Sequence, residues 1–221
     1  ISILNGGLAA AEISAGATTW YSWWDMKTSG SDGDKEMDPQ FLYGPALSVK
    51  FSDDYNLTFV FLYGTFDMKE DSGTNEISRY DSDLALNYRL GNYFKLFAGV
   101  KYMAYEMEDF SHRSIGPGAG ISAVLPVGGN FYLLGNVSGL YLRGKHKQDY
   151  NGESEQETDY VEYGMNSSIS MAYYIAPASV TLSLGGRYQY FKTNFEPDPN
   201  NSDMDHHFYG ITAAATYSFK I

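Results

Sequence analysis

The sequence predicts an all-β fold, a transmembrane up-and-down antiparallel β-barrel of about ten strands. Apolar and polar side chains alternate with a period of two in about ten segments, which is the periodicity of a β-strand with one apolar face. The connections between these segments alternate between tight turns and long polar loops. No run of apolar residues approaches the roughly 18 that a membrane-spanning helix needs.

Segment 179–191 shows the alternation clearly. Leu182 and Leu184 fall on one face of the expected strand. Ser183 and Arg187 fall on the other face. Successive side chains of a strand point to opposite sides of the sheet, so the charged residue shares its side with small polar residues. The same pattern in the other segments predicts one apolar wall and one polar wall.

Ten strands are expected, together forming a single barrel domain over residues 12–221. Their predicted ranges are 12–27, 41–52, 56–68, 79–90, 93–106, 115–127, 130–143, 160–175, 179–192 and 207–221.

The connections justify these boundaries and orient the barrel. The short connections carry the Gly, Asn, Asp and Pro residues that tight turns require, at 53–55, 91–92, 128–129 and 176–178. The long connections are rich in charged residues, Gly, Asn and Ser, at 28–40, 69–78, 107–114, 144–159 and 193–206. In a membrane barrel the short turns face the periplasm and the long loops face outward, so both chain ends are expected on the periplasmic side.

The polar face indicates which wall lines the lumen. A soluble barrel would place large apolar residues inside and polar residues outside. Here the polar face carries residues such as Asn136, Ser138 and Asn166, which would make a poor dry core but a suitable lumen. We therefore expect the apolar residues, Leu86 and Val100 among them, to contact lipid. Aromatic residues near the strand ends predict the aromatic belts of a membrane protein.

The last segment carries a resemblance to a known class of proteins. Tyr217, Phe219 and Ile221 occupy alternate positions and end the chain. They resemble the C-terminal signal of bacterial outer-membrane β-barrel proteins, in which the terminal residue is usually Phe. The resemblance extends along the chain as the layout of strands and loops. It implies a multi-pass protein of the bacterial outer membrane that contacts outer-membrane lipid and lipopolysaccharide and is recognised by the barrel assembly machinery; contact with other envelope proteins stays open.

Composition and charge narrow the classes of function. The 221 residues carry a formal net charge of −12, which argues against a nucleic-acid partner because such proteins neutralise phosphates with Lys and Arg. The chain has no cysteine, so disulfides and thiolate metal sites are excluded. Acidic residues crowd three expected loops, at 32–38, 153–159 and 196–205. They are either solvated loops or rims that attract cations.

The first eleven residues are expected to lie outside the barrel. Segment 1–11 ends in Ala9, Ala10 and Ala11, the small-residue ending of a secretory cleavage site. It lacks a charged start and a full apolar core. The segment is therefore either the remnant of a signal peptide, with a mature start at Glu12, or an N-terminal tail.

Charged residues on the expected lumen face are candidates for lining a pore. A ten-strand barrel is narrower than the porins that hold an open channel, so any passage would be thin. The same residues could instead pair with one another and fill the lumen. The candidate lumen residues are Lys50, Asp83, Arg89, Lys101, Glu162 and Arg187.

One arrangement suggests catalysis at the outer rim. Asp81 and Asp83 share a face, and Asp205, His206 and His207 precede the last strand. Such pairs could activate a water molecule, with His as general base. The arrangement is similar to the omptin surface proteases, which resemble this chain in strand number and oppose acidic and His-Asp pairs across the outer mouth. The predicted strands are too short for such a cleft.

A second enzymatic alternative is weaker. His112 with Ser111 and Ser114 is similar to the Ser and His of lipid-modifying barrels. No Ser lies in a nucleophile-elbow motif. We expect no cofactor, because the sequence shows no glycine-rich phosphate loop followed by a helix. We expect no metal site, because segment 32–36 lacks the remaining ligands of a calcium loop. The leading prediction is a non-enzymatic outer-membrane barrel that is either a narrow pore for small solutes or a structural and surface-contact protein.

Overall fold

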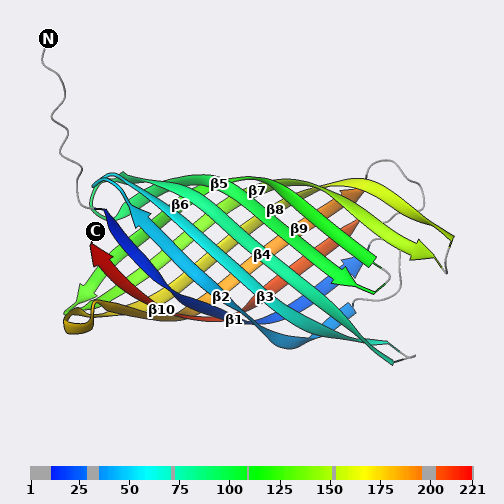
Figure 1. Cartoon of the computed structure of the whole chain (residues 1–221), viewed down its shortest axis with the longest axis horizontal. Helices are drawn as coiled ribbons and strands as arrows, with labels where there is room; N and C mark the ends of the chain where they lie inside the picture. The colour runs from blue at the N-terminus through cyan, green and yellow to red at the C-terminus, as the bar shows by residue number, and fades with distance from the viewer. Residues whose placement is uncertain are drawn as a thin grey trace, which may run out of the picture.

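A computed structural model describes residues 11–28, 35–70, 73–108, 110–150, 153–195 and 203–220. Within these ranges the chain forms ten antiparallel strands, and β1 pairs with β10 to close the barrel (Figure 1). The strands are β1 (Glu12–Thr28), β2 (Lys35–Lys50), β3 (Tyr55–Glu70), β4 (Gly73–Leu90), β5 (Phe94–Met107), β6 (Phe110–Gly128), β7 (Phe131–Tyr150), β8 (Glu153–Ile175), β9 (Val180–Phe195) and β10 (Met204–Lys220).

Every strand pairs with its neighbours in sequence, as an up-and-down barrel requires. Closure leaves no free edge, so the backbone groups of the wall are hydrogen-bonded within the sheet. The ends of β1 and β10 meet at the end of the barrel that carries the tight turns (Figure 1). The predicted all-β fold with about ten strands is confirmed.

The tight turns have the backbone geometry that their sequences indicate. Gly91, Gly128 and Gly129 all have positive φ angles, which favour glycine because other side chains are strained there. Residues 176–178 form one turn of 3-10 helix, and Ser179 closes it in the left-handed conformation at φ 52°. These four connections lie at one end of the barrel, the periplasmic end in this class of proteins.

The apolar face points outward, as the sequence predicts. Leu184 on β9 is 61% exposed, and Leu86 on β4 and Val100 on β5 are also exposed. Tyr141 and Tyr163 form an outward-facing pair on β7 and β8, with their rings 5.5 Å apart. The apolar wall with its aromatic border is the surface of a barrel that spans a membrane. No helix of the described residues is long and apolar enough to cross a membrane.

The strands are longer than predicted at the loop end of the barrel. β8 begins at Glu153, and much of the expected loop 144–159 is therefore strand. Here Lys145 pairs in register with Asp159, and Lys147 pairs with Glu157. Charged residues occupy the outward face above the membrane, so the apolar alternation disappears although the ladder continues. A strand of 17 residues at the tilt of a membrane barrel spans about 40 Å, more than the apolar belt of about 25 Å.

The short strand lengths from which the sequence analysis argued against a cleft at the outer mouth are therefore wrong. Some other predictions lie outside the described residues: segment 1–10 of the expected tail, residues 32–34 and 196–202 of two acidic segments, and Ile221.

Candidate functional site in the barrel interior

Alternate residues of each strand enter the interior, and the register brings the charged ones together. On β4 the odd-numbered residues Arg79, Asp81 and Asp83 point inward. Asp83 pairs in register with Lys101 on β5. Arg187 enters from β9, on the other side of the barrel. The interior charges thus come from strands far apart in the sequence.

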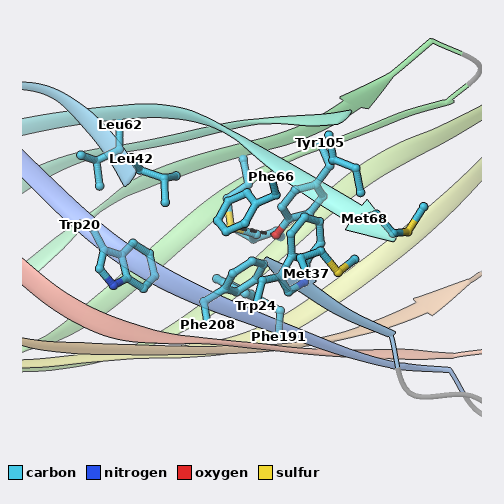
Figure 2. Close-up of a cluster of buried hydrophobic side chains, with 13 residues drawn as sticks. Trp20, Trp24, Met37, Leu42, Leu62, Phe66, Met68, Tyr105, Phe191 and Phe208 are labelled. Carbon is cyan, nitrogen blue, oxygen red and sulfur yellow. Dashed lines mark hydrogen bonds between the residues drawn. The ribbon is translucent and has the colours of Figure 1, made fainter. Parts of the chain in front are cut away.

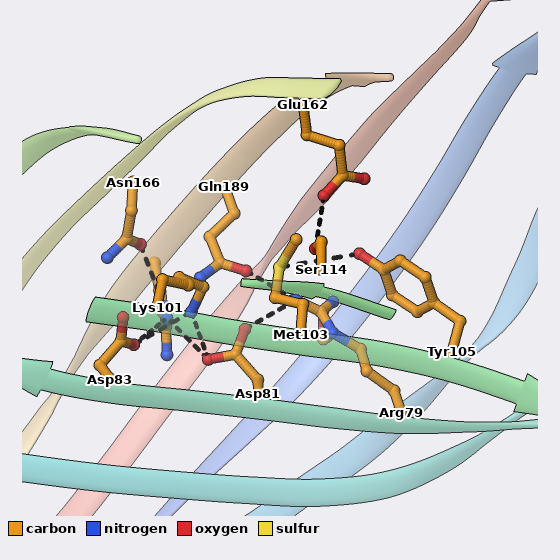
Figure 3. Close-up of polar contacts among 12 residues, drawn as sticks. Arg79, Asp81, Asp83, Lys101, Met103, Tyr105, Ser114, Glu162, Asn166 and Gln189 are labelled. Carbon is orange, nitrogen blue, oxygen red and sulfur yellow. Dashed lines mark hydrogen bonds and ion pairs between the residues drawn. The ribbon is translucent and has the colours of Figure 1, made fainter. Parts of the chain in front are cut away.

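Asp81 is the centre of this charged network (Figure 3). It is fully buried, and its carboxylate accepts hydrogen bonds from Lys101 Nζ at 2.6 Å and from Arg79 Nη2 at 3.0 Å. Arg187 Nη2 lies 3.5 Å from the same carboxylate. Three cations around one buried carboxylate compensate the desolvation of the charge, which costs several kcal/mol without partners. The network crosses the barrel and holds its walls together.

Asp83 extends the network toward the turn end. Its Oδ2 lies 3.1 Å from Lys101 Nζ and 3.4 Å from Arg187 Nη2. Arg187 Nε donates to Asn166 Oδ1 at 3.1 Å. The Asp83 side chain remains one-third exposed, because it borders a cavity. The charged network therefore meets solvent on one side only.

An apolar layer fills the interior on the loop side of the network (Figure 2). Trp20 and Phe208 are fully buried, with ring centres 6.5 Å apart. Trp24 packs against Phe208 and against Tyr105, with ring centres 5.0 Å apart in both pairs. The other buried members of this layer are Met37, Leu42, Leu62, Phe66, Met68, Ile77, Met103, Leu142 and Phe191. We call this set of residues the plug layer.

A second polar cluster surrounds Glu162 beside the plug layer. Glu162 is fully buried and accepts hydrogen bonds from Ser114 Oγ at 2.7 Å and Thr193 Oγ1 at 2.9 Å. His112 Nε2 lies 3.0 Å from Glu162 Oε1, and His112 Nδ1 lies 3.4 Å from His146 Nδ1. Each carboxylate oxygen is therefore satisfied by a local donor. The candidate lumen residue Glu162 is enclosed in packed protein.

Two cavities occupy the interior on the turn side of the network. The upper cavity, of about 340 Å³, borders Asp83, Lys101 and Arg187. The mouth cavity, of about 360 Å³, lies at the turn end and is lined by Lys50, Arg89 and Lys95 among others. The candidate lumen residues thus separate into three levels: Lys50 and Arg89 at the mouth, Asp83, Lys101 and Arg187 in the middle, and Glu162 beside the plug layer.

The candidate catalytic residues do not form one site. Asp81 and Asp83 lie inside the barrel and are occupied by cations. Asp205 and His207 point to the outside of the wall, where they bond to the hydroxyl groups of Tyr190 and Tyr188. His206, between them, points inward and accepts a hydrogen bond from Trp24 Nε1. Alternation along β10 separates the residues that the protease interpretation requires to be together.

The alternative of a lipid-modifying enzyme meets a similar difficulty. His112 and Ser114 are buried inside the barrel rather than facing lipid, and both contact Glu162 instead of each other. Ser111 belongs to the outer wall. The Ser114 hydroxyl donates to a carboxylate and not to His112, so the Ser–His pair of this interpretation is not formed among the described residues.

The sequence interpretation missed the inward-facing aromatic residues. It described a lumen of small and charged residues, whereas the rings of Trp20, Trp24 and Phe208 are also buried inside the barrel. The run of five residues from Trp20 to Trp24 holds three tryptophans and a tyrosine, which places large rings on both faces of β1. Two rings on the polar face were the available signal for an occluded interior.

The residues of the expected assembly signal lie on the outer wall. Tyr217 and Phe219 point outward near the end of β10, with ring centres 6.0 Å apart. They pair in register with Ala15 and Ile13 on β1, at the seam that closes the barrel.

Comparisons with known proteins agree with this architecture. No protein-family model matches the sequence, and no characterised protein matches it in a sequence comparison. Among solved structures, the outer membrane protease OmpT from Escherichia coli matches with a TM-score of 0.64 and 12% identity, over 99% of this chain and 99% of that one. The outer membrane protein AlkL in lipid bilayers gives 0.49 and 11% over 100% and 95%. Neisserial surface protein A gives 0.42 and 14% over 95% and 97%. At these identities the match to OmpT indicates a shared fold.

Proposed function

We propose that this bacterial outer-membrane β-barrel is a structural and surface-contact protein whose lumen is closed to solutes. The observation that supports the proposal is the plug layer. Trp20, Leu142, Phe191 and the adjacent Arg79 are all fully buried, and they come from β1, β7, β9 and β4, which are distributed around the barrel. A solute cannot pass a level at which the inward side chains are packed against one another to the density of a protein core.

Conductance in planar lipid bilayers tests this proposal. The wild-type barrel is expected to insert without producing stepwise current. The double variant Trp20→Ala and Phe208→Ala removes the two rings nearest Arg79 and is expected to conduct. Current through this variant would show that the barrel inserts into the bilayer, so that the silence of the wild type reports a closed lumen. A matched control, Tyr21→Ala and Tyr209→Ala, removes two rings from the outward faces of the same strands and is expected to stay silent.

Stepwise current through the wild-type barrel at moderate voltage would overturn the closed-lumen proposal. It would favour the second candidate, a narrow pore, for which the two cavities on the turn side provide half of a path. In that case, neutralising Arg187 or Asp83 is expected to alter the ion selectivity of the current, because both side chains border the upper cavity.

The outer wall at the loop end provides a contact surface for outer-membrane lipid. A groove of about 450 Å³ on β6, β7 and β8 is lined by four cations, Arg113, Arg143, Lys145 and Lys147. On β7 the residues that line this groove come after Tyr141, so the groove lies on the loop side of the aromatic border. Glu106 and Glu157 pair with three of the cations, and the Lys145 ammonium holds the pKa of Glu157 below its usual value through a hydrogen bond. We propose that phosphate groups of lipopolysaccharide bind in this groove.

Lipid retained during purification tests the contact. Arg113 and Lys145 face each other in register, and placing like charges opposite each other is unfavourable without an anion between them. The variant Arg113→Gln with Lys145→Gln is expected to retain less lipopolysaccharide than the wild type. Equal retention would contradict the proposal. Lys27→Gln with Lys192→Gln is the control for the same loss of charge on other strands.

We also propose that the end of β10 acts as the assembly signal of the barrel. Its support is the pair of outward rings, Tyr217 and Phe219, at the closing seam. The variant Phe219→Ser is expected to slow insertion into the outer membrane in cells, measured as the fraction of folded barrel. Ser218→Ala changes the neighbouring inward residue and is expected to insert normally. Normal insertion of both variants would contradict this role.

A further inference from the structure

The turn-side half of the lumen is a polar space that is closed at its inner end. The mouth cavity and the upper cavity lie along the same strands, with Asn56 in the first and Thr58 in the second. The charged network and the plug layer close the upper cavity on the loop side. Any ligand of this space therefore enters from the periplasmic end. The space is separate from the outer-wall groove and from the end of β10 described above.

The mouth cavity collects three cations, two of which have no counterion among the described residues. Lys50, Arg89 and Lys95 enter it from β2, β4 and β5. Lys50 pairs with the exposed Asp53 at 3.1 Å. Arg89 Nε donates to the backbone oxygen of Gly91, and Lys95 Nζ donates to Asn56 Oδ1 at the long distance of 3.5 Å. Within the described part of the chain, neither Arg89 nor Lys95 has an ion pair, and both repel Lys50.

The upper cavity supplies hydrogen-bonding groups. Hydroxyl and amide side chains from several strands border it, including Thr18, Asn136, Ser138, Ser168 and Thr212. Two cations, Lys101 and Arg187, stand at its closed end. Such a lining suits the oxygen atoms of a small polar molecule better than an apolar ligand, because hydroxyls and amides can both donate and accept.

The charge balance of this half of the lumen differs from that of the whole chain. Its two cavities are lined by four carboxylates and five cations: Glu12, Asp53, Asp54 and Asp83, and Lys50, Arg89, Lys95, Lys101 and Arg187. Asp53 is paired with Lys50, and Asp83 is paired with Lys101 and Arg187. The whole chain carries a formal net charge of −12. Arg89 and Lys95 are therefore the lining cations that have no ion pair among the described residues.

We propose that this periplasm-facing half of the lumen binds a small organic anion. Arg89 and Lys95 hold its carboxylate or phosphate group at the mouth, with Lys50 beside them. Its polar remainder lies in the upper cavity among the hydroxyl and amide groups. Binding relieves the repulsion between the mouth cations and displaces only the weak Lys95 contact to Asn56.

Thiol reactivity provides a direct test, because the natural chain has no cysteine. Ser48→Cys places a reporter thiol in the mouth cavity. Its rates of modification by an anionic and by a cationic methanethiosulfonate are measured on the folded barrel in lipid, and each rate is divided by that of free cysteine. A positive mouth raises the normalised anionic rate over the cationic one by about tenfold. Inorganic phosphate serves as the probe ligand and is compared with chloride at equal ionic strength.

Two charge variants are built on the reporter chain. Arg89→Gln with Lys95→Gln is expected to abolish both the preference for the anionic reagent and the protection of the thiol by phosphate. Lys145→Gln with Lys147→Gln removes the same charge from the outer wall and is expected to preserve both effects.

Two results would overturn the proposal: no phosphate protection in the wild-type background, or equal protection in both charge variants. The bilayer conductance is read separately, so a conducting barrel with a phosphate-protected thiol would reject the closed lumen and retain the anion site. A barrel that does not conduct and whose thiol is not protected by phosphate would retain the closed lumen and reject the anion site.

Discussion

The guanidinium carbon of Arg79 lies 3.5 Å from the centre of the Phe208 ring, in the middle of the barrel (Figure 2 shows Phe208 among its apolar neighbours). The same guanidinium donates to Asp81 and to Gln189, at 3.0 and 2.7 Å. Among the described residues its Nε and Nη1 have no hydrogen-bond partner, because they face aromatic rings instead. A desolvated cation over a ring is stabilised by about 2 kcal/mol. Arg79 therefore joins the charged network to the plug layer.

The charged network is expected to carry much of the stability of the barrel. Asp81→Asn leaves Lys101, Arg79 and Arg187 without their shared charge, and breaking a buried ion pair costs about 3–5 kcal/mol. The free energy of unfolding, measured with urea in phospholipid vesicles, is expected to fall by this amount. The control, Asp83→Asn, changes a carboxylate that is one-third exposed and is expected to cost about 1 kcal/mol. Equal losses for the two variants would contradict the central role of Asp81.

Close packing of rings over glycine is expected to limit substitution inside the barrel. A Cβ atom at Gly164 would overlap the ring of Phe191, a member of the plug layer. Gly164→Ala is therefore expected to lower the free energy of unfolding by about 1–3 kcal/mol through overpacking. Gly139→Ala serves as the control, because nothing lies within 4 Å of a Cβ atom built there. Destabilisation by Gly139→Ala alone would show that the interior is looser than the contacts indicate.

The orientation of the wall predicts opposite responses of adjacent residues. Leu184 points outward at mid-height between the aromatic borders, so Leu184→Arg is expected to cost about 2–4 kcal/mol, as at the midplane of a bilayer. Ser183 points into the upper cavity, and Ser183→Arg is expected to cost about 1 kcal/mol or less. Unfolding in vesicles of defined lipid measures both values. A larger loss at Ser183 would mean that the two faces of β9 are reversed.

The fold could be predicted from the sequence because a membrane-facing wall imposes a strict period on every strand. Leu182 and Leu184 point outward and Ser183 points inward, so their alternation is visible without a structure. The strand extensions at Lys145 and Glu157 could not be predicted in the same way. Above the membrane both faces are polar, and an outward Lys on a strand has the same composition as a Lys in a loop.

The sequence was sufficient to predict which charged residues point into the barrel, but less sufficient to predict that packed rings fill part of the lumen. The inward positions of Lys101 and Arg187 follow from the alternation of side chains along a strand, because every second residue points to the same side of the sheet. The hydrogen bonds that Arg79 donates to Asp81 and Gln189 depend also on which strands lie opposite each other across the barrel. The alternation of side chains along a strand does not specify this. The plug layer depends on which rings meet in space. Only the tryptophans at even positions of β1 indicated that the lumen is occupied.

Thiol accessibility along β1 tests the central claim, that the lumen is open from the turn end only as far as the charged network. Thr18→Cys and Ser22→Cys are conservative, both point inward, and Trp20 lies between them. Thr18 borders the upper cavity, whereas Ser22 is fully buried. A small charged thiol reagent is expected to modify Thr18→Cys readily in the folded barrel and to leave Ser22→Cys unmodified until the barrel is unfolded. Rapid modification of both thiols in the folded barrel would reveal a continuous water path past Trp20 and contradict the closed lumen.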